Sequence, residues 1–129
     1  MKPVHKVQLA TRIWGLALYV HLTTRTRPLP EVVASLAGRS PRRPYGLGPI
    51  RLGSIVTRAL TIGGRPPRCV IAALVAFRLN RSEGHPVELV IGLPQHPTDK
   101  DAHAWLEMAG RDVGPPPGRL GHLELARYS

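Results

Sequence analysis

The chain of 129 residues carries a formal net charge of +10, and 43% of its residues are hydrophobic while only 5% are aromatic. This length fits a single domain with one modest core, and the apolar content excludes global disorder. The most apolar run, Val7 to Leu22, is interrupted by polar residues and is too short for a membrane span, and no signal-peptide pattern opens the chain. With a single, unpaired cysteine, these features predict a cytoplasmic protein without membrane contact.

The excess positive charge is confined to the first half of the chain. Residues 1–68 contain 12 lysines and arginines and one acidic residue, whereas residues 69–129 contain 6 basic and 7 acidic residues. A basic half steers acidic partners such as nucleic acid, an acidic peptide or an acidic protein surface. An arginine-rich composition inherited from a GC-rich genome would explain the same counts without a function, so both interpretations stay open.

The first half of the chain predicts helices. Apolar residues recur at helical spacing from Lys6 to Thr24, which predicts a long helix packed on the core. Leu29 to Ala37 predicts a short second helix, and Ile50 to Ile62 predicts a third that ends at a pair of glycines. Between them, the segment Arg39 to Pro49 is rich in proline and arginine, which predicts an exposed loop.

The second half predicts one buried helix followed by strands. Cys69 to Leu79 is apolar on every face, as expected for a helix surrounded by other elements. Val87 to Leu93 is typical of a buried strand. His103 to Met108 predicts a further strand, which a turn at Ala109-Gly110 reverses into a hairpin partner at Arg111 to Val113.

The proline-rich stretch from Gly114 should leave the sheet as an extended loop before His122 to Ala126. Helices first and a small antiparallel sheet last predict an α+β domain. We expect residues 1–129 to form a single domain, with a basic helical part at 1–64 and a catalytic core at 65–129.

Cys69 is the only cysteine, so it forms no internal disulfide and cannot supply the several thiolates of most structural zinc sites. Two roles remain for it, a small buried hydrophobe or a nucleophile. At the first turn of a helix, the backbone N–H groups and the positive end of the macrodipole favour the thiolate, and Arg65 and Arg68 act in the same direction. His103, on a strand of the predicted sheet, is the candidate base.

Three motifs carry a family resemblance: Arg68-Cys69-Val70, Gly84-His85-Pro86-Val87 leading into Leu89-Val90-Ile91-Gly92, and Ala102-His103-Ala104-Trp105-Leu106-Glu107. Together they resemble the cysteine-peptidase half of the lasso-peptide B protein, a leader peptidase with a papain/transglutaminase-like core. The resemblance covers about Arg65 to Tyr128. It implies a Cys-bearing helix packed on a small antiparallel sheet.

The resemblance also implies site residues. The family's nucleophile falls on Cys69 and its general base on His103. Where relatives place the aspartate that orients the histidine, this chain has Pro115. Asp112 is the nearest acid and is our candidate for that role, which requires a shift of hairpin register or a bulge. Otherwise a backbone carbonyl or a side chain such as Glu124 orients the imidazole.

What the resemblance implies about function is a hydrolase that removes the leader from a ribosomally made lasso-peptide precursor, without a cofactor or metal. The implied partners are the precursor, a separate leader-binding protein and the lasso cyclase. Our own inference from charge is that the basic half receives the leader or the leader-binding protein.

Other readings compete with this one. A cluster of basic residues would suit a nucleic-acid-binding module. The chain lacks a recognisable nucleic-acid-recognition motif, however, so we expect no nucleic-acid partner. The cluster comprises Arg39, Arg42, Arg43, Arg51 and Arg58.

An acyltransferase or an inactive scaffold would keep the fold and lose the hydrolysis. A metal site built from Cys69, His96 and His103 lacks short ligand spacing, and Ser54 lacks the Gly-x-Ser-x-Gly elbow.

Overall fold

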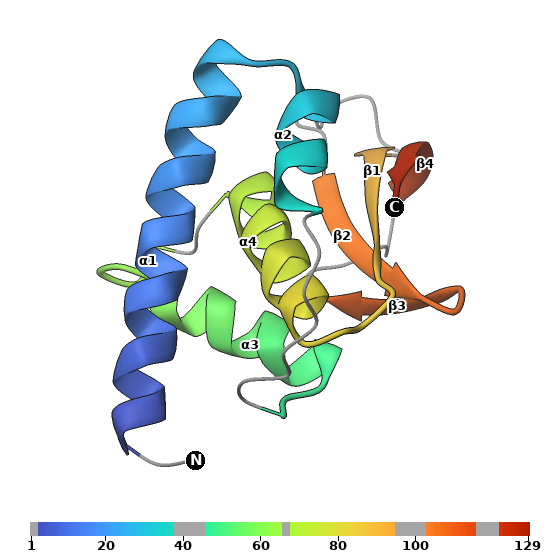
Figure 1. Ribbon diagram of the computed structural model, residues 1–129. Helices are drawn as coiled ribbons and strands as arrows, with labels where there is room; N and C mark the ends of the chain where they lie inside the picture. Colours follow the sequence, from blue (N-terminus) through green and yellow to red (C-terminus); the bar gives the residue numbers. More distant parts are fainter. Residues whose placement is uncertain (1–2, 38–45, 66–67, 95–102, 116–121) are drawn as a thin grey trace.

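The computed structural model describes residues 3–37, 46–65, 68–94, 103–115 and 122–129. In these ranges four helices precede four strands, which is the α+β architecture that the sequence predicts (Figure 1). The elements are α1 (Pro3–Thr26), α2 (Leu29–Leu36), α3 (Pro49–Leu60), α4 (Cys69–Ser82), β1 (Glu88–Pro94), β2 (His103–Met108), β3 (Arg111–Gly114) and β4 (His122–Tyr128).

The described strands form one antiparallel sheet in the order β3-β2-β1-β4. The predicted hairpin between β2 and β3 is present, and its turn residues Ala109 and Gly110 have φ values of 54° and 78°. Positive φ at both positions matches the twist of the two strands. The pairing of β4 with β1 was not predicted, and the loop predicted before it falls at 116–121, outside the described residues.

Helix α4 lies between α1 and the sheet (Figure 1). Its residues from Ala73 to Phe77 are fully buried, which explains why the segment is apolar on every face. The alanines let the neighbouring elements approach closely, while Phe77 fills the core beside them. Burying a side chain the size of Phe77 stabilises the fold by about 2–3 kcal/mol. The central position of α4 fixes its first residue, Cys69, relative to the sheet.

Helix α1 packs on the core along one face only. Leu9, Ile13 and Val20 are buried on that face. The prediction of a core helix was therefore right for one side, whereas the opposite side carries exposed apolar residues. These are Val7, Trp14, Leu18 and Leu22. No helix within the described ranges is long and apolar enough to cross a membrane.

The loop expected before α3 ends at Gly48, one residue earlier than predicted. Gly46 to Gly48 is irregular, but Pro49 begins α3 instead of ending the loop. Proline suits the first position of a helix because its missing N–H would have no helical acceptor there. The rest of the predicted loop, residues 39–45, lies outside the described residues.

Candidate active site

Cys69 is the first residue of α4 and follows Arg68, whose extended backbone (φ −60°, ψ 136°) caps the helix. The first α4 hydrogen bond runs from the Ala72 amide to the Arg68 carbonyl, at 3.0 Å. Helical geometry therefore gives the preceding amides, such as those of Val70 and Ile71, no acceptor within the helix. Their N–H groups and the positive helix end favour negative charge beside the sulfur.

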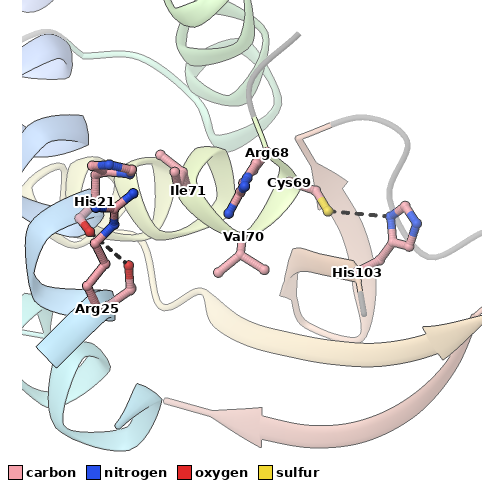
Figure 2. A pocket seen from close by; sticks show the side chains of 8 residues that line it. His21, Arg25, Arg68, Cys69, Val70, Ile71 and His103 are labelled. Carbon is pink, nitrogen blue, oxygen red and sulfur yellow. Dashed lines mark hydrogen bonds between the residues drawn. The ribbon is translucent and has the colours of Figure 1, made fainter. Parts of the chain in front are cut away.

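His103 is the first residue of β2, as predicted, and pairs with Gly92 of β1. Its Nδ1 lies 3.5 Å from the Cys69 Sγ, within hydrogen-bond reach for sulfur (Figure 2). The side chains of Cys69 and His103 are both half-buried, so each remains accessible from the surface. The fold thus brings the predicted nucleophile and base together from a helix and a strand that lie far apart in the sequence.

A cleft with a volume of about 640 Å³ opens beside this pair. Its wall comes from the C-terminal part of α1, the start of α4 and the first residue of β2. The lining residues are His21, Thr24, Arg25, Arg68, Cys69, Val70, Ile71 and His103 (Figure 2). The size is in the range of small-ligand pockets, enough for part of an extended peptide. Sequence reasoning missed His21 and Arg25, because helical periodicity does not say which neighbour a helix meets.

The strand register does not bring Asp112 to the imidazole. Asp112 pairs with Glu107, and from Glu107 back to His103 the strand runs about 13 Å, at about 3.3 Å per residue. One Asp112 carboxylate oxygen accepts the Gly114 amide at 2.8 Å. At Pro115, the position that the resemblance implied for the aspartate, the backbone packs on α3: a Cβ added to Gly53 would lie 3.4 Å from the Pro115 Cα. The orienting role of Asp112 stays a prediction.

Asp112→Asn tests that role. An orienting carboxylate fixes the tautomer of the imidazole, so if Asp112 has this role its loss should slow turnover by at least about tenfold, with the thermal midpoint unchanged. Steady-state rates of the two proteins provide the measurement. A rate near that of the wild type would transfer the role to another acceptor, such as a backbone carbonyl or Glu124.

Arg127 of β4 ties three strands together. Its guanidinium donates to the buried Glu107 of β2 at 3.0 Å, forms a hydrogen bond with Glu124, and lies 3.6 Å from Glu88 of β1. The carboxylates of Glu124 and Glu107 raise the pKa of Arg127, which keeps it cationic. The other Glu107 oxygen accepts the indole N–H of the buried Trp105 at 2.8 Å. These contacts hold β2, and with it the backbone of His103, in a fixed register.

Only part of the predicted basic cluster lies in the described residues. Arg51 and Arg58 of α3 line a second groove with Lys6 of α1, whereas Arg39, Arg42 and Arg43 lie outside the described residues. In the ranges that the structure describes, no group of three histidine, cysteine or acidic side chains is placed to hold a metal ion. His96 also falls outside these ranges.

Comparisons with known proteins agree with this geometry at the level of the family. The family model described as "Transglutaminase-like superfamily" matches residues 7–124, which include both the helical half and the sheet. No curated protein and no solved structure gave a significant match. Since the family model spans most of the chain and the fold has the expected helices and small antiparallel sheet, the protein belongs to the transglutaminase-like superfamily.

Proposed function

We propose that the protein is a cysteine peptidase that removes the leader from a ribosomally made lasso-peptide precursor. The observation that carries the proposal is the 3.5 Å approach of the Cys69 Sγ to the His103 Nδ1 at the edge of an open cleft. Membership of the transglutaminase-like superfamily, whose members are often cysteine enzymes, supports the same chemistry. The motifs around Cys69 and His103 supply the resemblance to lasso leader peptidases in particular.

The reaction follows from the two side chains. The His103 imidazole takes the thiol proton, and the Cys69 sulfur attacks the carbonyl carbon between leader and core. The negative oxygen of the tetrahedral intermediate is stabilised by N–H groups at the start of α4. The C–N bond then breaks, and the imidazolium gives its proton to the amine of the departing core. Water, deprotonated by the imidazole, cleaves the thioester, which releases the leader as a carboxylate and restores the thiol.

The proposal includes partners. A separate leader-binding protein presents the precursor, and the freed core amine passes to a separate lasso cyclase. We place all of these steps in the cytoplasm, where a single thiol stays reduced. The basic half of the chain, including Arg51 and Arg58 at the second groove, is our candidate for receiving the leader or its carrier.

Mass spectrometry tests the proposal directly. Candidate precursor peptides are incubated with the protein, with and without a candidate leader-binding protein. The expected products are leader and core, whose combined mass exceeds that of the precursor by one water, formed fastest with the partner present. A product in which an added amine replaces the core would indicate an acyltransferase, and recovery of intact precursor under all conditions would reject both reactions.

His103→Gln is expected to slow cleavage by a factor of about 10² to 10⁴, the usual contribution of a general base. Glutamine keeps a polar side chain on the first residue of β2 but cannot accept the thiol proton. The variant is assayed by the rate of leader release, and far-UV circular dichroism serves as the control for folding. Cleavage within a factor of three of the wild-type rate would mean that another group activates the sulfur.

A further inference from the structure

The cleft beside Cys69 is lined with cations. Arg25 reaches it from α1, Arg68 from the residue before α4, and His21 adds a group that is cationic when protonated (Figure 2). Neither aspartate nor glutamate occurs among the described residues that line it. The positive helix end of α4 acts on the same space.

No carboxylate among the described residues pairs with Arg25 or Arg68; the described ion pairs gather around Arg127 at β4 instead. Both side chains are exposed to solvent at the cleft. Cations that face one cavity attract an anion and raise its local concentration, most strongly at low ionic strength.

We propose that this cleft binds a carboxylate of the substrate, so that the acyl-donor peptide carries an aspartate or glutamate close to the bond that is cleaved. Arg25 and Arg68 hold this carboxylate through charge-assisted hydrogen bonds, the geometry for which guanidinium is suited. The inference rests on the proposed function, because it names the substrate class of the same site. It makes an acidic residue, rather than an apolar one, the feature that positions the peptide against the sulfur.

The charge of the cleft can be measured without a known substrate. Iodoacetate and iodoacetamide both alkylate a thiolate by displacing iodide, with formation of the same S–C bond, and they differ in carrying a carboxylate or a neutral amide. The ratio of their second-order rate constants at Cys69 therefore reports the attraction of the site for a carboxylate. Because both reagents attack the same thiolate, changes in the thiolate population cancel in the ratio.

We expect the iodoacetate-to-iodoacetamide ratio at Cys69 to exceed that of free cysteine by about fivefold or more in low salt and to fall as salt is added. Arg25→Gln and Arg68→Gln should each lower the ratio, and the double variant should approach free cysteine. Arg111→Gln is the matched control, since Arg111 is also exposed but lies on β3 and does not line the cleft. A ratio equal to that of free cysteine, or one that Arg25→Gln and Arg68→Gln leave unchanged, would overturn the proposal.

A second arm uses peptides. In a cleaved precursor, acidic residues near the scissile bond are replaced one at a time by asparagine or glutamine. At one position KM should rise at least about fivefold with wild-type protein, and the rise should disappear in the Arg25→Gln, Arg68→Gln double variant. Equal KM values for all peptides would refute the acidic substrate class. The alkylation ratio stays informative even if no peptide is cleaved, so failure of this inference is distinguishable from failure of the peptidase assignment.

Discussion

Cys69→Ala is expected to lower the rate of leader release by a factor of about 10⁴ or more. The substitution removes the atom that would form the thioester, and no other cysteine exists in the chain to replace it. Removal of a nucleophile from a catalytic pair typically costs rates of this order, because the remaining groups supply only binding and electrostatic stabilisation. Leader release followed by mass spectrometry over a time course measures the loss.

The same variant should fold as well as the wild type. Cys69 is half-buried at the first turn of α4, and alanine has a higher helix propensity than cysteine. The urea midpoint is therefore expected to change by less than the equivalent of about 1 kcal/mol. Cleavage by Cys69→Ala at the wild-type rate would remove the nucleophile assignment, whereas loss of folding would leave the activity result without meaning and would call for Cys69→Ser instead.

Trp105→Ala is expected to destabilise the fold by about 3–5 kcal/mol, the usual cost of truncating a buried tryptophan. Trp105 is fully buried, and its indole N–H donates to the buried carboxylate of Glu107. The variant therefore leaves a cavity and also removes a donor from a buried charge. The free energy of unfolding of a small domain is only about 5–15 kcal/mol, so the variant would lose a large part of it. Urea unfolding followed by far-UV circular dichroism measures the change.

The chain contains a natural control for this prediction. Trp14, the other tryptophan, is 46% exposed on the outer face of α1. Trp14→Ala removes the same atoms from a site where water already contacts the ring, so it should cost less than about 1 kcal/mol. Equal losses in the two variants would show that the burial of Trp105 does not set its contribution.

Much of the fold follows from local sequence patterns. The segment from Cys69 to Leu79 is apolar on all sides, and its length and alanines favour a buried helix over a strand; α4 is such a helix. The strand His103 to Met108 and its turn at Ala109-Gly110 were placed correctly because alternation and a glycine after the strand are short-range signals. The pairing of β4 with β1 depends on register between distant segments, which no local pattern encodes.

The candidate site also has a part that the sequence predicted and a part that it did not. The approach of His103 to Cys69 was expected, because the family motifs place these residue types at a helix start and at the beginning of a strand. The cations at the cleft were not expected to act together. Arg25 lies near the end of a helix whose rotation about its own axis is set by packing, so only tertiary structure brings it to the wall beside Arg68.

The sulfur and the imidazole belong to two elements that touch through buried side chains rather than through a short stretch of chain. Their spacing therefore depends on how tightly α4 packs on β2. A collapsed form that kept its helices but lost close packing would retain the far-UV circular dichroism signal of the native protein. It would nevertheless have no catalytic activity. For this protein, turnover should serve as a probe of tertiary order that reports damage before secondary structure does.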